Sequence, residues 1–484
     1  MSKVELKFQI PSSKLKALRL AFLHCQPEKN YLHAQYFDTA HLDLQRQHLS
    51  LRQHKENKIW VQTLEAPKSS VEYIEIKTSL GRAEPSTVNL RPCQPYKKFK
   101  HLLHPVFQSN HPLIFQFKTD ISSQRFLHTE KNSKIELSLD LGTISSTHQS
   151  LEIHEIKFEL KDGNIHDLIQ TIQPWLSKYE IWLDSQSKTV KGQALQQSFP
   201  VAAAQSQSAL TLSPQADSIQ ALQQMVSNCL EHLLPNASAI ALEQYKAEHI
   251  HQVRVAIRRL RSALKIFSSP QIAQTKIWQK QLAVLFRQLG NTRDRDALAA
   301  DLLPLLKQAG SPIAELPAQE TAKTQIGAIF RAAPTTGLWL QFIDFANAEQ
   351  PKGQKLKKCI RKQFNKMHQR ICQAESIFTE MAESEKHQVR KRVKQLRYSI
   401  EFICSLYAPS DIKQYLKVLK PLQENLGRFN DLCVAHVLFE QNIVQQPKAW
   451  FVLGWIASEQ KHIQQAIQQD LQKFQQVQRF WQSK

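Results

Sequence analysis

Apolar and polar residues alternate with a period of two along several segments of the first 193 residues, a pattern typical of half-buried β-strands. These segments are residues 4–10, 49–54, 60–64, 73–77, 115–118, 135–140 and 153–160. Apolar residues at helical spacing predict helices at about 11–24 and 164–178. Charged residues fill the polar positions of nearly every strand. That polar face is either a wet outer surface or a barrel interior, where buried charges need a charged ligand or ion.

The pattern becomes helical in the second half of the chain. Residues 197–216 are polar and small without strong periodicity, which predicts a linker between domains at 1–196 and 217–484. The predicted helices are 217–234, 238–268, 272–288, 291–307, 353–382, 385–407, 410–425, 428–441 and 448–481. Gly290 and Gly427 are at positions where helices are expected to end. Residues 308–350 are less regular. The fold class is therefore an α+β domain followed by an all-α domain.

One basic segment occurs twice in the helical half. His251–Arg261 (HQVRVAIRRLR) returns 136 positions later as His387–Arg397 (HQVRKRVKQLR). Leu289–Asp294 (LGNTRD) recurs 137 positions later as Leu426–Asp431 (LGRFND). Two matched motifs at nearly the same offset predict a duplicated unit, with copies at about 217–310 and 353–445.

Each copy of the basic segment places cations beside an apolar stripe. The predicted buried stripes are Ile250, Val253, Ile257, Leu260, Leu264 and Phe267, and then Val389, Val393, Leu396 and Ile400. The adjacent polar rows are His251, Arg254, Arg258, Arg261 and Lys265, and then His387, Arg390, Lys394 and Arg397. Like charges one helical turn apart repel, and neither row contains an acidic residue. A bound polyanion would relieve this repulsion, and the arginine fork suits phosphate oxygens.

The overall composition is strongly basic. The net charge is +21, of which residues 1–200 contribute +6 and residues 201–484 contribute +15. This excess favours anionic partners, although solubility alone could also explain it. No apolar run is long enough for a membrane span, and the N-terminus has no apolar signal region. The seven cysteines form no Cys-x-x-Cys pair, which favours reduced thiols and a cytoplasmic location.

The two basic segments, each followed by Leu-Gly-x-x-x-Asp, resemble the motifs of a CHAD domain over residues 215–482. The resemblance implies two four-helix units related by pseudo-two-fold symmetry. Known members bind inorganic polyphosphate through basic residues that face a central cleft. The resemblance therefore implies that the two polar rows are polyphosphate-binding residues facing each other.

The first 193 residues resemble a CYTH domain. The segments that carry the resemblance are Val4–Phe8, Tyr36–Thr39, Leu49–Arg52, Trp60–Leu64, Ile135–Asp140 and His154–Lys157, in the order of the family. The resemblance implies an eight-stranded antiparallel tunnel that binds triphosphate and a divalent metal. Many CYTH–CHAD fusions are inorganic triphosphatases.

The resemblance assigns roles to charged residues of this half. Lys7, Arg52, Arg125 and Lys188 would bind and process triphosphate, and Glu5, Glu136 and Glu155 would hold Mg²⁺ or Mn²⁺ if the tunnel is active; Glu72 is a further tunnel residue. The sequence departs from the family at several of these positions. Lys3 and Lys157 replace two acids, His54 and Glu65 replace two basic residues, and serines replace an arginine before Arg125. A cation beside a metal site opposes metal binding, so we expect a degraded tunnel.

Three functions follow from these patterns. The leading hypothesis is a protein that binds inorganic polyphosphate in the helical half and carries a degraded triphosphate tunnel. The alternative is an active, divalent-metal-dependent inorganic triphosphatase, a hydrolase. A basic nucleic-acid-binding module is the third, but aromatic residues for base stacking are not interleaved with the cations of either row.

Overall fold

The computed structural model describes most of the chain, and its contacts divide the chain into two compact units. The described residues are 2–56, 58–67, 72–85, 87–93, 96–109, 111–195, 201–267, 271–290, 292–317 and 325–482. Unit 1 contains Met1–Ser206, Leu230–Val253 and Gln325–Ala348, and unit 2 contains Gln207–Cys229, Arg254–Thr324 and Glu349–Lys484. Unit 1 therefore includes the whole sheet and two helical segments from later in the chain.

The sheet of unit 1 is antiparallel and nine-stranded. Its strands are β1 (Ser2–Gln9), β2 (Glu28–Thr39), β3 (Ser50–Glu56), β4 (Ile59–Pro67), β5 (Glu72–Gly81), β6 (Leu113–Glu130), β7 (Ser133–Ser145), β8 (Ser150–Asp162) and β9 (Trp182–Leu183). The order is β5-β4-β3-β2-β6-β7-β8-β1-β9, and β1 also pairs with β5. This second pairing covers three residue pairs, from Ser2↔Ile74 to Val4↔Glu72. The predicted barrel is thus joined at this seam over a short distance and is not closed along its full length.

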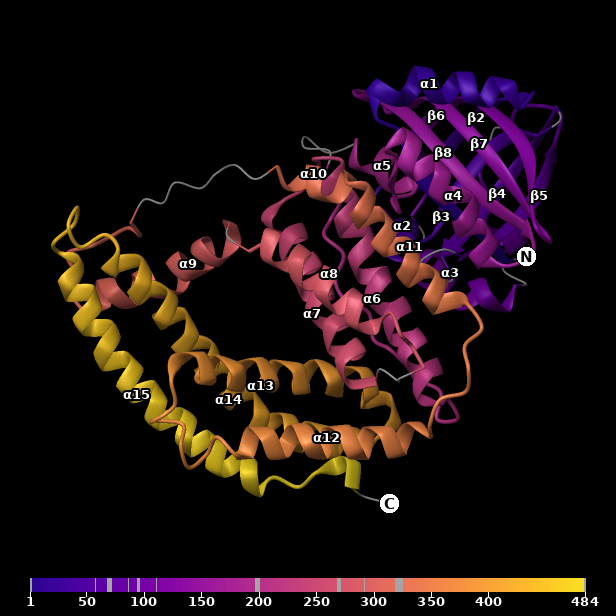
Figure 1. Cartoon of the computed structure of the whole chain (residues 1–484). Helices are drawn as coiled ribbons and strands as arrows, with labels where there is room; N and C mark the ends of the chain where they lie inside the picture. The colour runs from indigo at the N-terminus through magenta and orange to yellow at the C-terminus, as the bar shows by residue number, and fades with distance from the viewer. Residues whose placement is uncertain are drawn as a thin grey trace. The chain divides into compact units, whose positions relative to one another are not determined.

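Apolar side chains on the outer face of the sheet are covered by four helices, α1 (Ser12–His24), α2 (Asp43–Arg46), α3 (Lys97–Ser109) and α4 (Ile165–Tyr179) (Figure 1). Phe22 of α1 packs edge-on against Phe126 of β6 and Trp175 of α4. A second cluster joins Leu51, Leu64 and Leu103 beneath α2 and α3. The predicted helices at 11–24 and 164–178 are confirmed. Burial of these apolar surfaces stabilises the strands. The opposite face of the same strands carries the polar residues.

The opposite face of the sheet is polar and largely buried, which decides between the two interpretations of the alternating charges. Asp140 and Glu155 are fully buried on this inner face. The short helix α5 (Lys188–Ala194) contacts β6 and β7 there. Its Gly192 lies so close to Phe117 that a Cβ atom would be 2.4 Å from the ring. The charged residues of the strands therefore line an interior instead of a wet outer surface.

The rest of the chain is helical among the described residues. The helices are α6 (Ser218–Ala241), α7 (Ala247–Phe267), α8 (Thr275–Gln288), α9 (Thr292–Gln308), α10 (Ile326–Arg331), α11 (Ala333–Asn347), α12 (Leu356–Cys372), α13 (Glu383–Ile403), α14 (Pro409–Glu440) and α15 (Ala449–Gln476). None of these described helices is long and apolar enough to cross a membrane. All the apolar residues that we predicted for the stripes of α7 and α13 are buried.

Several helix boundaries differ from the prediction: α7 begins at Ala247 and not near 238, and α12 ends at Cys372 and not near 382. Gly427 lies inside the continuous helix α14, where we expected a break. Buried Leu426 and Phe429 belong to one apolar stripe that spans this position, so packing outweighs the helix-weakening effect of glycine. α6 likewise continues through Pro235. Residues 308–350, which looked irregular, contain α10 and α11.

The predicted linker has no regular secondary structure in its described part, 201–216, but it packs on helices. Within unit 1, His249 and the Ala202 carbonyl are 3.1 Å apart. Within unit 2, the Leu212 N–H donates to Ser405 at 2.9 Å. Leu212 is buried. Residues 196–200 lie outside the described residues.

Candidate functional site

Strand register arranges the inner-face residues in rows across β1, β8, β7 and β6. The first row is acidic, with Glu5 opposite Glu159 and Glu159 opposite Glu136. The second row is cationic and contains Lys7, Lys157, Ser138 and Arg125. The third contains Gln9, Glu155, Asp140 and Ser123. Period-two alternation thus places the predicted Glu5, Lys7, Arg125, Glu136 and Glu155 on one face.

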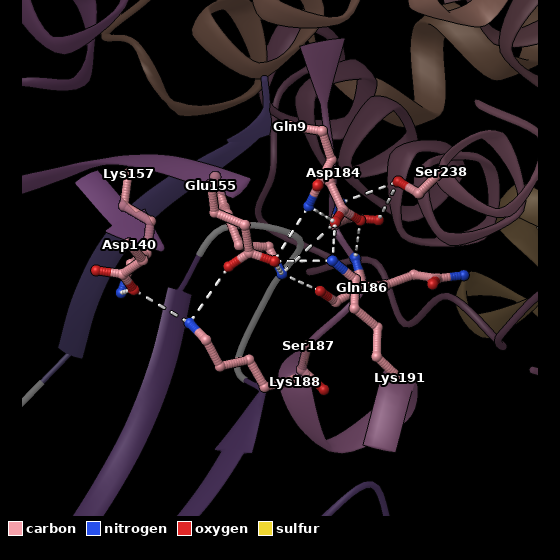
Figure 2. A network of polar contacts seen from close by, with 12 residues as sticks. Gln9, Asp140, Glu155, Lys157, Asp184, Gln186, Ser187, Lys188, Lys191 and Ser238 are labelled. Carbon is pink, nitrogen blue, oxygen red and sulfur yellow. Dashed lines mark hydrogen bonds and ion pairs between the residues drawn. The ribbon is translucent and has the colours of Figure 1, made fainter. Parts of the chain in front are cut away.

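Lys191 of α5 contacts two buried carboxylates at once. Its Nζ lies 2.8 Å from Glu155 Oε1 and 2.6 Å from Asp184 Oδ2, as Figure 2 shows. Gln9 Nε2 donates to the same two oxygens, at 3.1 Å and 2.7 Å. Lys7 donates to the Gln186 carbonyl and is 3.7 Å from Glu155. These contacts fasten α5 and the segment after β9 to the sheet.

Asp140 is the centre of the adjoining part of the network. Its Oδ2 lies 2.7 Å from Lys157 Nζ and 3.2 Å from Lys188 Nζ, and Lys188 also approaches Glu155 Oε2 at 3.3 Å. Ser123 donates to Asp140 Oδ1 at 2.7 Å, and Arg125 Nε donates to Ser123 at 3.2 Å. We call Lys7, Gln9, Ser123, Arg125, Asp140, Glu155, Lys157, Asp184, Lys188 and Lys191 the inner-face network.

The charges of this network hold the acids ionised despite burial. Burial acts to raise the pKa of Asp140, but Lys157 and Lys188 outweigh it and lower that pKa to about 2. Burial likewise acts to raise the pKa of Glu155. Lys191, Lys7 and Lys188 outweigh it and hold that pKa well below its ordinary value. The pKa of Lys7 is lowered, mainly by burial. The network therefore holds tightly paired charges.

Arg52 lies on the same face of the sheet but contacts a different acid. Its NH2 group is 2.6 Å from Glu65 Oε1 on the neighbouring strand. Near it, Glu56 contacts both His54 and Lys77, each at 2.8 Å. The structure therefore pairs Glu65, which replaces an expected base, with the arginine that remains. Each cation here has an acidic neighbour, which reduces its availability to an anion.

The three predicted metal ligands are not brought together. Glu5 and Glu136 both lie opposite Glu159 on β8, one on each side of it, whereas Glu155 is four residues away along β8, roughly 13 Å by strand geometry. Lys161 lies 3.2 Å from Glu136 and 2.7 Å from Glu159. The side chains of Lys3 and Glu72 are outside the described residues.

The polar row of α7 includes two arginines that pack on an aromatic ring. Arg254 is buried, donates to the Leu289 carbonyl at 2.8 Å and lies over the Phe286 ring, 5.0 Å from its centroid. Arg254 therefore fixes the end of α8. Arg258 lies over the same ring at 5.7 Å. His251 is one turn before Arg254 on the helix.

Cations of three helices converge at the end of α7 in unit 2. The pKa of Lys265 is lowered, first by burial and then by Arg370 of α12 and Arg392 of α13. Arg261 and Lys391 act in the same direction. Burial also lowers the pKa of Arg261. We call Arg261, Lys265, Arg370, Lys391 and Arg392 the cationic cluster.

The polar row of α13, which begins at His387, has acidic and amide neighbours. His387 Nδ1 lies 2.9 Å from Asn430 Oδ1. Burial raises the pKa of Asp431, and Arg390 and Lys394 oppose that rise. Arg397 pairs with Glu401 at 3.3 Å. The second copy of the Leu-Gly motif thus places its aspartate beside this row.

Several residues of the two sites were missed by the sequence analysis. Arg259 is buried in unit 2, donates to Asn228 at 3.0 Å and lies over Phe402, 4.8 Å from the ring centroid. Asp184 and Lys191 complete the inner-face network. The spacing of Lys188 and Lys191, three residues apart on one helix, was the available signal for the second lysine.

Comparisons with known proteins agree with both halves of the fold. A family model for the CYTH domain matches residues 1–192, and one for the CHAD domain matches residues 224–440. An inorganic triphosphatase of Haemophilus influenzae is 25% identical over 204 residues, which are 40% of this chain and 55% of that protein. The chain therefore spans about half the length of the curated relative that it matches.

Two solved structures each match part of the chain. The CHAD domain of the plant Ricinus communis is 27% identical with a TM-score of 0.42, and the match covers 57% of this chain and 98% of that one. A Hippeastrum protein described as having a dominant triphosphatase activity is 16% identical with a TM-score of 0.28, and the match covers 38% of this chain and 91% of that one.

Proposed function

Because the chain belongs to the CYTH–CHAD fusions, with a CYTH domain followed by a CHAD domain, we propose that it binds inorganic polyphosphate through the cations of its helical half. The observation that carries the proposal is the cationic cluster. Burial lowers the pKa of Lys265, and four nearby cations from α7, α12 and α13 lower it further. Crowding of like charges is unfavourable, and a chain of phosphates would offset it.

The chemistry of the cluster suits a phosphate chain. Arginine supplies planar pairs of N–H donors to phosphate oxygens, and lysine supplies a compact charge. Successive cations on one helix face are roughly 5.4 Å apart, so one extended polyanion can contact several turns. On the same helix face, Arg254 and Arg258 lie over the ring of Phe286, which is thus occupied by guanidinium groups. This favours a phosphate chain over single-stranded nucleic acid, which uses such rings for base stacking.

The proposal is tested by titrating the full chain with polyphosphate of defined length in EDTA, by calorimetry. We expect Arg261→Ala with Lys265→Ala to weaken binding roughly ten- to a hundredfold, since a hydrogen bond to a charged group contributes about 1.5–3 kcal/mol. The matched control is Lys461→Ala with Lys473→Ala, which removes two exposed cations of α15 in the same unit. Equal affinities for the two double variants would contradict the proposal.

A second candidate function is hydrolysis of inorganic triphosphate in the CYTH domain. The similarity to the Haemophilus influenzae protein favours it. In that case Lys7, Arg52, Arg125 and Lys188 would contact the phosphates. We expect instead no phosphate release at enzyme-like rates with Mg²⁺ or Mn²⁺. Release of phosphate that Glu5→Ala abolishes would favour the triphosphatase.

A further inference from the structure

Carboxylates on the inner face of the sheet are held by lysines and are not grouped around a position for a divalent ion. Mg²⁺ needs oxygen ligands at roughly 2.1 Å in near-octahedral geometry. Lys161 instead bridges Glu136 and Glu159, and Lys157 contacts Asp140. Among the residues that the structure describes, no group of three or more His, Cys, Asp or Glu side chains could hold a metal. The residues present therefore do not fit the ion that the CYTH family implies.

In the second, middle row of the inner face, two lysines lie directly opposite each other. Lys7 of β1 lies opposite Lys157 of β8, an arrangement that is unfavourable for like charges. On β6, Arg125 donates to the hydroxyl of Ser123. On β2, the residue opposite Arg125 is Glu28, so an acid also borders this end of the row. The row from β1 to β6 crosses three strand intervals, roughly 14 Å.

The inner-face network has more cations than acids. Lys7, Arg125, Lys157, Lys188 and Lys191 stand against Asp140, Glu155 and Asp184. With all groups ionised, these residues alone carry two more positive than negative charges, and the adjoining acidic row of Glu5, Glu136 and Glu159 with Lys161 offsets that difference over the face as a whole. Burial and then the neighbouring lysines act against the charged form of Lys7, while Asp184 and Glu155 support it. An anion that contacts the middle row would offset the local repulsion between Lys7 and Lys157.

We propose that the inner face binds a short inorganic phosphate chain without a divalent ion, because the ammonium groups of Lys157 and Lys161 occupy the carboxylates that such an ion would need. The inference rests on the proposed function only in taking a phosphate chain as the ligand. The site itself is separate from the cationic cluster. Lys157 contributes a single fixed charge, so it attracts phosphate oxygens but supplies no metal-bound water.

The first test is tripolyphosphate binding by the full chain in EDTA, measured by calorimetry. It is made with Arg261→Ala and Lys265→Ala present, so that the cationic cluster contributes little. We expect binding to persist in EDTA. Because Mn²⁺ also binds free tripolyphosphate, the metal is examined on protein alone by electron paramagnetic resonance, where we expect no bound Mn²⁺. Tripolyphosphate binding that occurs only with Mn²⁺, or not at all, would overturn the inference. Long-chain binding by the unmodified chain tests the proposed function independently.

The second test changes the lysine. In EDTA, Lys157→Glu should weaken tripolyphosphate binding at least tenfold, and the added carboxylate beside Asp140 should create detectable Mn²⁺ binding. Lys29→Glu makes the same charge change at an exposed outer-face position of β2 and should alter affinity less than twofold. Lys157→Gln, which introduces no negative charge, keeps the test open if the glutamate variant does not fold. It should weaken binding severalfold without Mn²⁺ binding. Unchanged affinity in a folded Lys157 variant would refute the inference.

Discussion

Lys191 shows how much a single buried charge controls at the residue scale. It is 4% exposed and contacts Glu155 and Asp184, both of which are also buried. Replacing it with methionine keeps much of the volume but leaves both carboxylates short of one positive partner. We expect Lys191→Met to lower the free energy of unfolding by about 3–5 kcal/mol, measured by urea denaturation of the full chain.

The loss of stability in Lys191→Met should come from unpaired negative charge. It should therefore be smaller when Asp184 is neutralised as well. Lys191→Met with Asp184→Asn should recover a measurable part of the lost stability relative to Lys191→Met alone. Additive losses in this double variant would show that Lys191 acts through packing and not through its charge.

The buried ring of His368 makes the free energy of unfolding depend on pH. It is 5% exposed, among the rings of Tyr415, Phe474 and Trp481, and burial lowers its pKa to about 4. The unfolded chain takes up a proton near pH 6.5, whereas the folded chain does so only near pH 4. The free energy of unfolding should therefore fall as the pH falls through this window, by up to about 3 kcal/mol.

Other acids also titrate at low pH, so the measurement is a difference between variants. Denaturation of the parent and of His368→Phe is compared from pH 7 to pH 4. The parent should lose more stability than the variant over this interval. Parallel pH profiles would contradict the role assigned to His368.

At the scale of elements, Gly427 and Gly192 should respond oppositely to alanine. Gly427 lies inside α14, and a Cβ atom there would meet nothing within 4 Å. We expect Gly427→Ala to stabilise the protein by about 0.5–1 kcal/mol, because alanine restricts the unfolded chain and favours helix. Gly192→Ala should destabilise, since its Cβ would overlap Phe117. Thermal unfolding of both variants checks the pair, and a lower melting temperature for Gly427→Ala would contradict it.

The same glycine shows where sequence patterns succeed and where they stop. Apolar periodicity identified the buried residues of α7 and α13, because a stripe needs only local spacing. It placed a helix end at Gly427, because glycine is a frequent C-cap, but the stripe through Leu426 and Phe429 continues across it. Only tertiary packing decides between these two outcomes.

The candidate sites were predictable to a similar degree. Alternation on the predicted strands placed Lys7 and Glu155 on polar faces, since side chains alternate at period two, whereas Arg125 was assigned from the family resemblance alone. Sequence could not show that Asp184 and Lys191 come beside Glu155, because neither belongs to a strand of the predicted pattern. Nor could it show that the predicted metal ligands are separated along β8, which follows from strand register. The degraded tunnel that we expected from the departures at Lys157 and Glu65 stays a prediction; the structure pairs both residues with opposite charges.

At the scale of the whole molecule, a net charge of +21 raises the question of whether polyphosphate binding is specific or merely electrostatic. Both kinds of binding release counterions and weaken as salt rises, so a salt dependence alone decides nothing. A localised site makes a sharper prediction. Removing two cations that contact the ligand should reduce the slope of log K against log salt by roughly 0.7 per cation.

We therefore expect Arg261→Ala with Lys265→Ala to flatten the salt dependence of long-chain polyphosphate binding, whereas Lys461→Ala with Lys473→Ala should leave it near that of the parent. Binding is measured between 50 and 300 mM NaCl, with single-stranded RNA of matched charge as competitor. RNA should compete poorly, because the Phe286 ring beside the cations of α7 is covered by Arg254 and Arg258 and is not available to stack on bases. Equal competition by RNA, or equal slopes for the two double variants, would mean that the basic surface attracts any polyanion and that the cluster is not a phosphate-chain site.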